Sequence, residues 1–254
     1  MPSSTLYSDL SHYYNLMCCD IDYREQCDFS HRLFHLLTMA ATTPIRSLDL
    51  ACGTGPHVEH FLSLGYNASG LDINAPMLTL AQARCPTATF MLQDMCNFVA
   101  PEPLSLITCF LYSMHYNYPA GNFWQTLQQA YNALETGGLF IFDMVDRDYI
   151  ANDSGYTHHL HNSEGDFSFQ SRWYDKKADD KLDLLITITK QNRGIKEQWQ
   201  DQHTMLALNT EHVITKLQSI GFEVTVFERD YSRLKLWQKN VGNVILACIK
   251  NHNN

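Results

Sequence analysis

The chain has 254 residues, of which 45% are hydrophobic and 18% are charged, and its formal net charge is -9. A chain of this length can bury a full hydrophobic core, and the composition argues against an intrinsically disordered protein. The acidic balance also disfavours a nucleic-acid partner, because phosphate binding requires clustered Lys and Arg side chains. The short basic stretch 229–239 is the candidate patch, and we interpret it as a solvated loop or strand edge.

The N-terminus does not resemble a secretory signal, because 1–15 lacks a basic region followed by an apolar run. No stretch approaches the roughly 20 apolar residues that cross a bilayer. The eight cysteines include no C-x-x-C pair, which is the usage expected in a reducing cytoplasm. The adjacent Cys18 and Cys19 could bind a soft metal, but we interpret them as reduced bystander thiols. We therefore expect a cytoplasmic protein with no membrane partner and no bound metal.

The first forty residues predict helices, the second of them over about Arg24–Met39. Strands and helices then alternate, and the apolar runs 106–107 and 139–142 are typical of strands covered on both faces. This alternation predicts a parallel sheet with right-handed crossovers. The expected strands are Arg46–Leu50, Asn67–Asp72, Ala88–Leu92, Leu104–Leu111 and Gly138–Asp143, and the expected helices are Pro56–Leu64, Ala75–Arg84 and Phe123–Leu134.

Beyond Asp146 the pattern changes to alternating apolar and polar residues, which is typical of an antiparallel sheet with one solvated face. A helix at Asn209–Ile220 and strands at Phe222–Phe227 and Asn243–Ile249 are expected to follow. The predicted fold is α/β: a Rossmann-like, seven-stranded, mostly parallel sheet sandwiched by helices, with an antiparallel β cap inserted after the fifth strand. The predicted divisions are the N-terminal helices and core (1–145), the cap (146–208), and the final helix and strands that complete the sheet (209–254), with cap strands at Phe167–Tyr174, Leu182–Lys190 and Gln198–Leu208.

A glycine loop follows the first predicted strand, in the sequence Ser-Leu-Asp-Leu-Ala-Cys-Gly-Thr-Gly-Pro that runs from Ser47 to Pro56. Gly53 and Gly55 allow a sharp turn and a close approach of the backbone to a ligand, and Pro56 suits the first position of a helix. The free N–H groups at the start of that helix suit a carboxylate or a phosphate. Neither register of the loop fits the G-x-G-x-x-G fingerprint of dinucleotide binding, and Asp49 suits an ammonium or sulfonium ligand better than a pyrophosphate.

Two further carboxylates follow the second and third predicted strands. Asp72 ends the second strand, where it can accept hydrogen bonds from both hydroxyls of a ribose. Asp94 follows the third strand, where it can accept a hydrogen bond from the amino group of an adenine. A single Asp at such a position is more often a turn or a helix cap. Asp49, Asp72 and Asp94 together lie at the edge where open α/β sheets bind ligands.

These motifs resemble those of class I S-adenosylmethionine-dependent methyltransferases, in particular small-molecule N-methyltransferases of the aminosugar N,N-dimethyltransferase and glycine N-methyltransferase type. The resemblance covers roughly Tyr14–Asp143. It implies that the chain binds S-adenosylmethionine and releases S-adenosylhomocysteine, with the glycine loop under the methionine part. Many relatives have a glycine at the position of Ala51. The cofactor-binding residues that the resemblance implies are Tyr14, Tyr23, Asp49, Ala51, Gly53, Gly55, Asp72 on the ribose, Ile73, Met77, Asp94 and Met95 on the adenine, and Phe110.

The methyl acceptor is expected beside the end of the fourth strand, which in those families faces the transferable methyl. The sequence there lacks the Asn/Asp-Pro-Pro-Tyr signature of enzymes that methylate bases or glutamine. His115 and Tyr116 are the candidate catalytic bases, and Tyr14 is a third candidate that could reach the site from the N-terminal helix. His115 could equally be a wall residue of the pocket. His203 could line the pocket from above, but we interpret it as a residue without a role in the reaction. The cluster 158–161 resembles a metal-binding tract, but with no carboxylate or cysteine nearby at ligand spacing we interpret it as a solvated loop.

The leading hypothesis is an enzyme, a monomer or homodimer, that methylates a small molecule, most readily at an amine nitrogen. One alternative is methylation of a peptide, a protein N-terminus or a carrier-bound intermediate, which an open groove over the site would favour. A second alternative is a regulatory protein that binds S-adenosylmethionine without transferring the methyl group. It remains open because Asp49, Asp72 and Asp94 indicate binding and not turnover.

Overall fold

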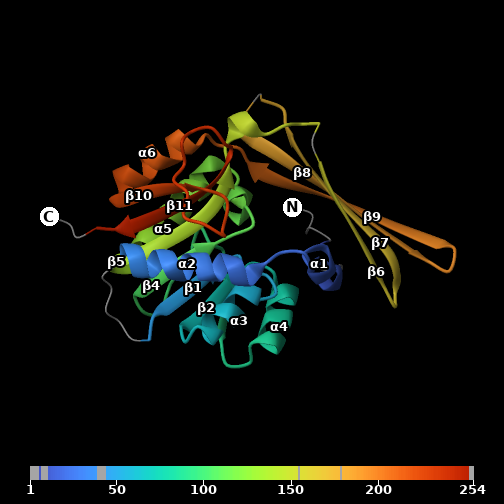
Figure 1. The fold of residues 1–254 in the computed structure, drawn as a ribbon, viewed down its shortest axis with the longest axis horizontal. Coiled ribbons are helices and arrows are strands. Elements are labelled where there is room, and N and C mark those ends of the chain that lie inside the picture. The colour runs from blue at the N-terminus through green and yellow to red at the C-terminus, as the bar shows by residue number, and fades with distance from the viewer. Residues whose placement is uncertain (1–5, 7–10, 39–43, 154, 178, 252–254) are drawn as a thin grey trace.

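A central sheet of seven strands runs through the body of the molecule, which the computed structural model describes over residues 6, 11–38, 44–153, 155–177 and 179–251 (Figure 1). The strand order is β10-β11-β5-β4-β1-β2-β3. β11 runs antiparallel to both of its neighbours, and the pairs from β5 to β3 are all parallel. The predicted seven-stranded, mostly parallel sheet is confirmed. Its strands are β1 Arg46–Leu50, β2 Asn67–Asp72, β3 Thr89–Leu92, β4 Leu104–Cys109, β5 Leu134–Val145, β10 Phe222–Glu228 and β11 Asn243–Lys250.

Helices cover both faces of this sheet. On one face α2 and α3 bury Phe29 and Phe61, and on the other α5 and α6 bury Phe123 and Leu217. The central strands send apolar side chains to both faces, which explains their continuous apolar sequence. Within the described part of the chain, no helix is long and apolar enough to cross a membrane. The helices of the body are α2 Tyr23–Leu37, α3 Pro56–Ser63, α4 Ala75–Arg84, α5 Ala120–Ala133 and α6 Thr210–Ile220.

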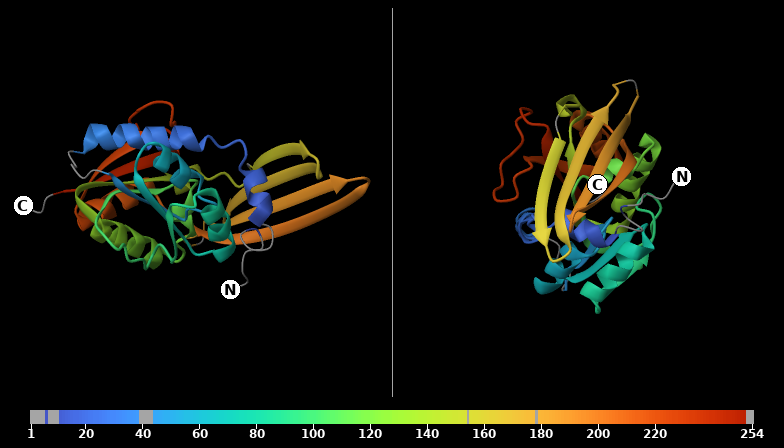
Figure 2. Two further views of the ribbon diagram at one scale, coloured as in Figure 1. Left: turned by 90° about the horizontal axis from the view of Figure 1, so that it is seen from below. Right: turned by 90° about the vertical axis from the view of Figure 1, so that its right-hand side faces the viewer.

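A second, antiparallel sheet follows β5 and extends away from the body (Figures 1 and 2). We call this sheet the cap. Its inner face buries Phe167, Phe169, Ile186 and Ile188. The antiparallel sheet expected after the fifth strand is therefore confirmed. Its strands, in spatial order, are β6 Gly155–Asn162, β7 Gly165–Asp175, β8 Lys181–Asn192 and β9 Ile195–Leu206.

One strand of the cap contradicts the sequence analysis. The stretch 158–161, expected to be a solvated loop, lies in β6 and pairs with β7 through partners such as His158 and Phe169. Positions 158 and 160 are half-buried and positions 159 and 161 are exposed, as expected for the edge strand of a sheet with one solvated face.

The short helix α1, Ser11–Met17, lies against the cap (Figure 2). The ring of Tyr13 is 5.4 Å from that of Phe167 and 5.5 Å from that of Trp199. Lys190 of β8 donates to the Tyr13 hydroxyl at 3.2 Å. These contacts attach α1 to the inner face of the cap, although the two segments lie far apart in the sequence.

Pairing sets the ends of several elements more firmly than local sequence does. β5 begins at Leu134 rather than Gly138, because Leu134 pairs with Leu104, and it ends at Val145, which pairs with Asn243. α2 ends at Leu37, and the predicted end at Met39 lies outside the described residues. The proposed divisions 1–145, 146–208 and 209–254 remain a prediction, and their outermost residues also lie outside the described part.

Candidate active site

The glycine loop after β1 turns through residues with positive φ. These angles are 53° at Ala51, 54° at Gly53 and 79° at Gly55, in the left-handed region that favours glycine. A Cβ atom at Gly55 would meet the Cβ of Ala81 at 3.1 Å, so this glycine permits the close approach of α4. A Cβ atom at Gly53 would come no closer than 3.8 Å to the ring of Tyr14. A side chain at this position would thus be in ordinary contact with Tyr14, and it is the left-handed φ of Gly53 that favours glycine there.

Asp49 is buried in β1, and side chains from two other elements hold its carboxylate. Thr108 donates to its Oδ1 at 2.7 Å, and Nδ1 of His57 lies 3.3 Å from its Oδ2. Nε2 of His57 is 2.7 Å from Oε1 of Gln26 on α2. The negative charge of Asp49 is thereby fixed in the wall beside the glycine loop, as a charge meant for a cationic ligand would be.

Asp72 connects the end of β2 to the glycine loop. Its Oδ2 accepts from the backbone N–H of Gly53 at 2.9 Å, and its Oδ1 accepts from the backbone N–H of Asn74 at 2.8 Å. Burial raises the pKa of Asp72 above its usual range, and the donated hydrogen bonds partly offset that effect. The carboxylate that the sequence assigns to the ribose is thus in place at the loop.

The other residues assigned to the adenine side lie on the neighbouring strand ends. The N–H of Gln93 donates to the carbonyl of Asp72, which joins the loops after β2 and β3. Asp94 is exposed and its Oδ1 accepts from the N–H of Cys96 at 3.0 Å. Ile73 is 66% exposed, whereas Met77 is 1% exposed on α4. Contacts of Ile73, Met77, Asp94 and the half-buried Met95 with a cofactor therefore remain predictions.

Two aromatic residues predicted for the cofactor site close a small pocket beside the loop. Tyr23 and Phe110 line it together with Tyr14, Asp49 and Ala51, around a free volume of about 20 Å³. Burial raises the pKa of Tyr23, so its hydroxyl keeps its proton. The structure thus places these five predicted residues around one pocket.

A larger cavity of about 760 Å³ lies next to this pocket, bordered by the core, α1 and the cap. Tyr14, Leu111 and Ser113 line both spaces, so the two meet there. Tyr116 and Trp173 line the larger cavity only. Pockets of about 300–1,000 Å³ are typical of small-molecule sites.

A buried carboxylate that the sequence analysis missed shapes the junction between the two spaces. Asp143, at 0% exposure, accepts from the N–H of Tyr112 at 2.7 Å, from Nε of Arg229 at 2.7 Å and from the hydroxyl of Tyr231 at 2.9 Å. It holds Leu111 and Tyr112 at φ values of 57° and 60°. The available signal was its position at the end of the predicted strand Gly138–Asp143, which matches that of Asp72 at the end of the second predicted strand.

Arg229 completes this arrangement. Its guanidinium lies over the ring of Tyr112, 4.4 Å from the centroid. Burial alone would lower the pKa of Arg229, but the charge of Asp143 outweighs that effect and raises it. Burial raises the pKa of Tyr112 to about 12. Arg229 belongs to the stretch interpreted above as a solvated loop or strand edge. It is half-buried beside Asp143, whereas Arg233, Lys235 and Lys239 are exposed as expected. Both Tyr112 and Arg229 line the larger cavity.

His115 does not fit the role of general base that the sequence predicted. It is 1% exposed, and its Nδ1 lies 2.6 Å from the carbonyl of Leu206 while its Nε2 accepts from the N–H of Val145 at 3.0 Å. Burial lowers its pKa. Because the backbone occupies both ring nitrogens, the imidazole has no atom to offer a methyl acceptor. His115 instead fastens the turn after β4 to β5 and β9.

Tyr116 and His203 form a polar chain that leads out of the cavity. The hydroxyl of Tyr116 is 2.7 Å from Nδ1 of His203, and Nε2 of His203 is 3.0 Å from Oδ2 of Asp201. The carboxylate also accepts from the N–H of Leu6 at 2.9 Å. Sequence reasoning gave His203 no role, because the 87 residues between it and Tyr116 conceal their contact.

Comparisons with known proteins agree with this site. Residues 48–138 match the family model described as a methyltransferase domain. A putative methyltransferase of Geobacillus sp. (strain WCH70) is 24% identical over 195 residues, which cover 74% of this chain and 77% of the relative. The dTDP-3-amino-3,4,6-trideoxy-alpha-D-glucopyranose N,N-dimethyltransferase of Streptomyces venezuelae is 32% identical over 96 residues, covering 38% of this chain and 40% of the relative.

Solved structures extend the likeness to the whole chain. An S-adenosylmethionine-dependent methyltransferase from Clostridium acetobutylicum superposes with a TM-score of 0.76 at 20% identity, covering 97% of this chain and 99% of the other. Streptomyces venezuelae DesVI gives a TM-score of 0.80 at 20% identity, covering 96% and 98%. Residues 48–138 therefore match a methyltransferase domain, in a chain that has the class I methyltransferase fold over nearly its whole length.

Proposed function

We propose that this protein transfers a methyl group from S-adenosylmethionine to a small-molecule amine held in the larger cavity. The observation that carries the proposal is that the cavity meets the glycine-loop pocket at Tyr14, Leu111 and Ser113. The methyl donor and the acceptor could then touch each other across that junction. Methyl transfer needs such contact, because it is an in-line displacement that is accelerated by positioning and desolvation.

The residues at the carboxyl ends of β1 and β2 fit S-adenosylmethionine, which when bound supplies a methyl carbon activated by its sulfonium. The glycine loop lines the small pocket through Ala51 and Thr54, where the methionine part would lie. A carboxylate has about four lone-pair directions. Gly53 and Asn74 occupy three of those of Asp72, one of them with the side-chain amide of Asn74 at 3.1 Å. The backbone N–H of Ile73 also donates to this carboxylate, so the ribose hydroxyls would replace the side-chain amide of Asn74.

The nature of the acceptor is supported by the relatives and by the size of the cavity. Relatives with partial coverage are named as N,N-dimethyltransferases of dTDP-linked aminosugars, so an amine attached to a sugar is the first acceptor class to consider. Residues of the core, α1 and the cap all border the cavity, and its volume of about 760 Å³ is in the range of small-molecule sites.

An ammonium acceptor must lose a proton before its nitrogen can attack, and we assign that proton to Tyr116. Asp201 can only accept, so Nε2 of His203 carries hydrogen and Nδ1 is the acceptor for the Tyr116 hydroxyl. As the ammonium gives its proton to the Tyr116 oxygen, the hydroxyl proton passes to His203 Nδ1. The imidazolium that results lies beside the carboxylate of Asp201, which stabilises it. Tyr14, at the junction, is the second candidate.

Isotopically labelled S-adenosylmethionine tests the proposal directly. The protein is incubated with a metabolite extract and, separately, with a dTDP-linked 3-amino sugar, and the labelled product is identified by mass spectrometry. We expect the label on the nitrogen of a small amine. Label on protein N-termini or on a carrier would overturn the assignment of the acceptor. Binding of S-adenosylhomocysteine with no labelled product from any fraction would favour a regulatory protein.

A further inference from the structure

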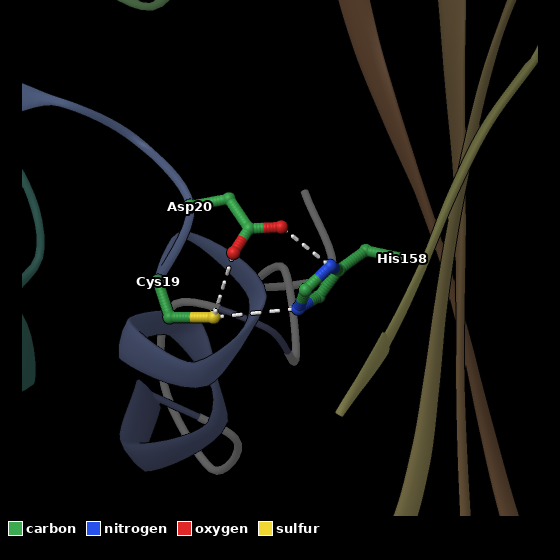
Figure 3. Close-up of side chains that lie close together, drawn as sticks. All are labelled: Cys19, Asp20 and His158. Atoms are coloured by element: carbon green, nitrogen blue, oxygen red, sulfur yellow. Dashed lines mark hydrogen bonds and ion pairs between the residues drawn. The ribbon is translucent and has the colours of Figure 1, made fainter. Parts of the chain in front are cut away.

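Three side chains with metal-binding atoms meet at the contact between the N-terminal region and the cap. Cys19 and Asp20 follow α1, and His158 lies 139 residues from Cys19 on β6 (Figure 3). Sγ of Cys19 is 3.3 Å from Nε2 of His158 and 3.7 Å from Oδ1 of Asp20. Among the described residues this is the group of His, Cys and acidic side chains whose ligand atoms converge within 4.8 Å.

The hydrogen bond between Asp20 and His158 orients the imidazole for a metal. Oδ2 of Asp20 is 2.7 Å from Nδ1 of His158, and a carboxylate can only accept, so Nδ1 carries the hydrogen. Nε2 then carries no hydrogen, and this nitrogen faces Sγ of Cys19 (Figure 3). A carboxylate that fixes the tautomer of a ligating histidine is a recurrent feature of zinc sites.

The spacing of the ligand atoms also suits a tetrahedral ion. With zinc–sulfur and zinc–nitrogen bonds of about 2.3 and 2.0 Å, tetrahedral angles separate sulfur from nitrogen by roughly 3.5 Å. The observed separation between Cys19 Sγ and His158 Nε2 is 3.3 Å. Cys19 and Asp20 are exposed, so water molecules can complete the coordination.

We propose that Cys19 and His158 bind one zinc-class divalent ion, with Asp20 orienting the imidazole, and that this ion fastens the end of α1 to β6 beside the acceptor cavity. Thiolate and imidazole ligands select zinc or its close analogues over magnesium and calcium, which prefer oxygen ligands. The location is at the edge of the larger cavity, because Asp20 and the first residues of β6, Gly155 and Tyr156, line it. The inference is independent of the methyl acceptor and revises the expectation that no metal is bound.

Binding requires the thiol proton to leave. Desolvation, and next the charge of Asp20, raises the pKa of Cys19, so the free protein carries a thiol there. When the ion bonds to sulfur, that proton goes to the solvent and His158 contributes its neutral imidazole. Zinc affinity should therefore fall about tenfold for each unit by which the pH is lowered.

Metal titration of the full-length protein, stripped with a chelator, tests this proposal. At about 10 µM protein, we expect the wild type to bind one zinc ion per chain, and cobalt substitution to give a thiolate-to-cobalt charge-transfer band. Cys19→Ser and His158→Gln should each weaken zinc binding at least about a hundredfold, and Asp20→Asn by about 10–100-fold. Zinc should also slow hydrogen exchange in α1 in the wild type but not in His158→Gln.

Matched controls come from the same part of the chain. His159 is exposed and adjacent to His158, on the opposite face of β6, and Cys96 is a half-exposed thiol elsewhere in the sequence. His159→Gln and Cys96→Ser should bind zinc as the wild type does. No zinc binding by the wild type at about 100 µM metal would overturn the proposal. The proposal would also be overturned if a Cys19→Ser/His158→Gln double variant bound zinc as the wild type does. A loss of zinc binding in the control variants as large as that in Cys19→Ser or His158→Gln would do the same.

Discussion

Two buried histidines beside the cavity differ in what their ring nitrogens contact. His115 is bonded on both sides by backbone groups of Leu206 and Val145, so it acts as a structural bridge between β9 and β5. His203 has a hydroxyl on one side and a carboxylate on the other. We therefore propose that the proton of the acceptor leaves along the chain that begins at Tyr116.

The substitution His115→Gln separates a structural role from a catalytic one. A glutamine amide can donate to the carbonyl of Leu206 and accept from the N–H of Val145, but it cannot take up a proton. We expect the variant to fold and to keep turnover within a few fold of the wild type. A hundredfold loss in steady-state kinetics would return His115 to the role of base.

The same variant gives a test of pH-dependent stability. Burial lowers the pKa of His115 from 6.5, so below that pH the unfolded chain binds a proton that the folded chain does not. The free energy of unfolding of the wild type should therefore fall on acidification through about pH 6.5, by up to about 1.4 kcal/mol per pH unit. Urea unfolding should show a smaller fall in His115→Gln. Parallel pH dependences would contradict the burial argument.

Tyr116→Phe and His203→Gln test the proton path itself. General-base contributions are about 10²–10⁴-fold, so both variants should lose at least about a hundredfold in kcat with affinity for S-adenosylhomocysteine nearly unchanged. The acidic limb of the pH–rate profile should flatten in both. His159→Gln, exposed on β6, is the control and should behave as the wild type. Near-normal turnover of Tyr116→Phe would move attention to Tyr14.

At the level of elements, the cap presents alternate residues of β7 to opposite faces. Trp173 lines the cavity and its ring is 5.1 Å from that of Tyr112, whereas Tyr174 is 43% exposed and does not line the cavity. Trp173→Ala should raise the KM for the acceptor at least about tenfold while leaving S-adenosylhomocysteine affinity within a few fold. Tyr174→Ala is the matched control, with little change in either. Equal losses of acceptor and cofactor binding in Trp173→Ala would mean that the cap supports the core.

The extent to which sequence predicts these elements depends on what determines each one. β1, β2 and α4 have the predicted bounds, because strong apolar runs and a glycine loop or proline mark their ends. β6 was missed, since it is polar and histidine-rich and owes its extended form to pairing with β7. The cofactor motif is local and could be read directly. The contacts of Tyr116 with His203 and of Cys19 with His158 join distant segments, and no local pattern reveals them.

At the scale of the whole molecule, the fold brings the glycine-loop pocket and the larger cavity to the same edge of the sheet. The order of the strands places β1 between β4 and β2, so the glycine loop lies between the junction residues after β4 and the carboxylate of Asp72. The chain leaves the core after Val145 and returns at the end of β9 near Met205, and both residues line the larger cavity. The cap is thus anchored at the space that it covers.

Binding of the reaction product tests the central claim most directly, that the strand ends around Asp72 hold S-adenosylmethionine. If the dissociation constant is about 10 µM, then 1 mM S-adenosylhomocysteine should stabilise the wild type by about 2.7 kcal/mol, or raise its Tm by roughly 5–10 °C. Asp72→Ala should lose most of that shift, whereas Tyr174→Ala should keep it. The account would be contradicted by a wild-type protein whose Tm ignores S-adenosylhomocysteine but rises with NAD.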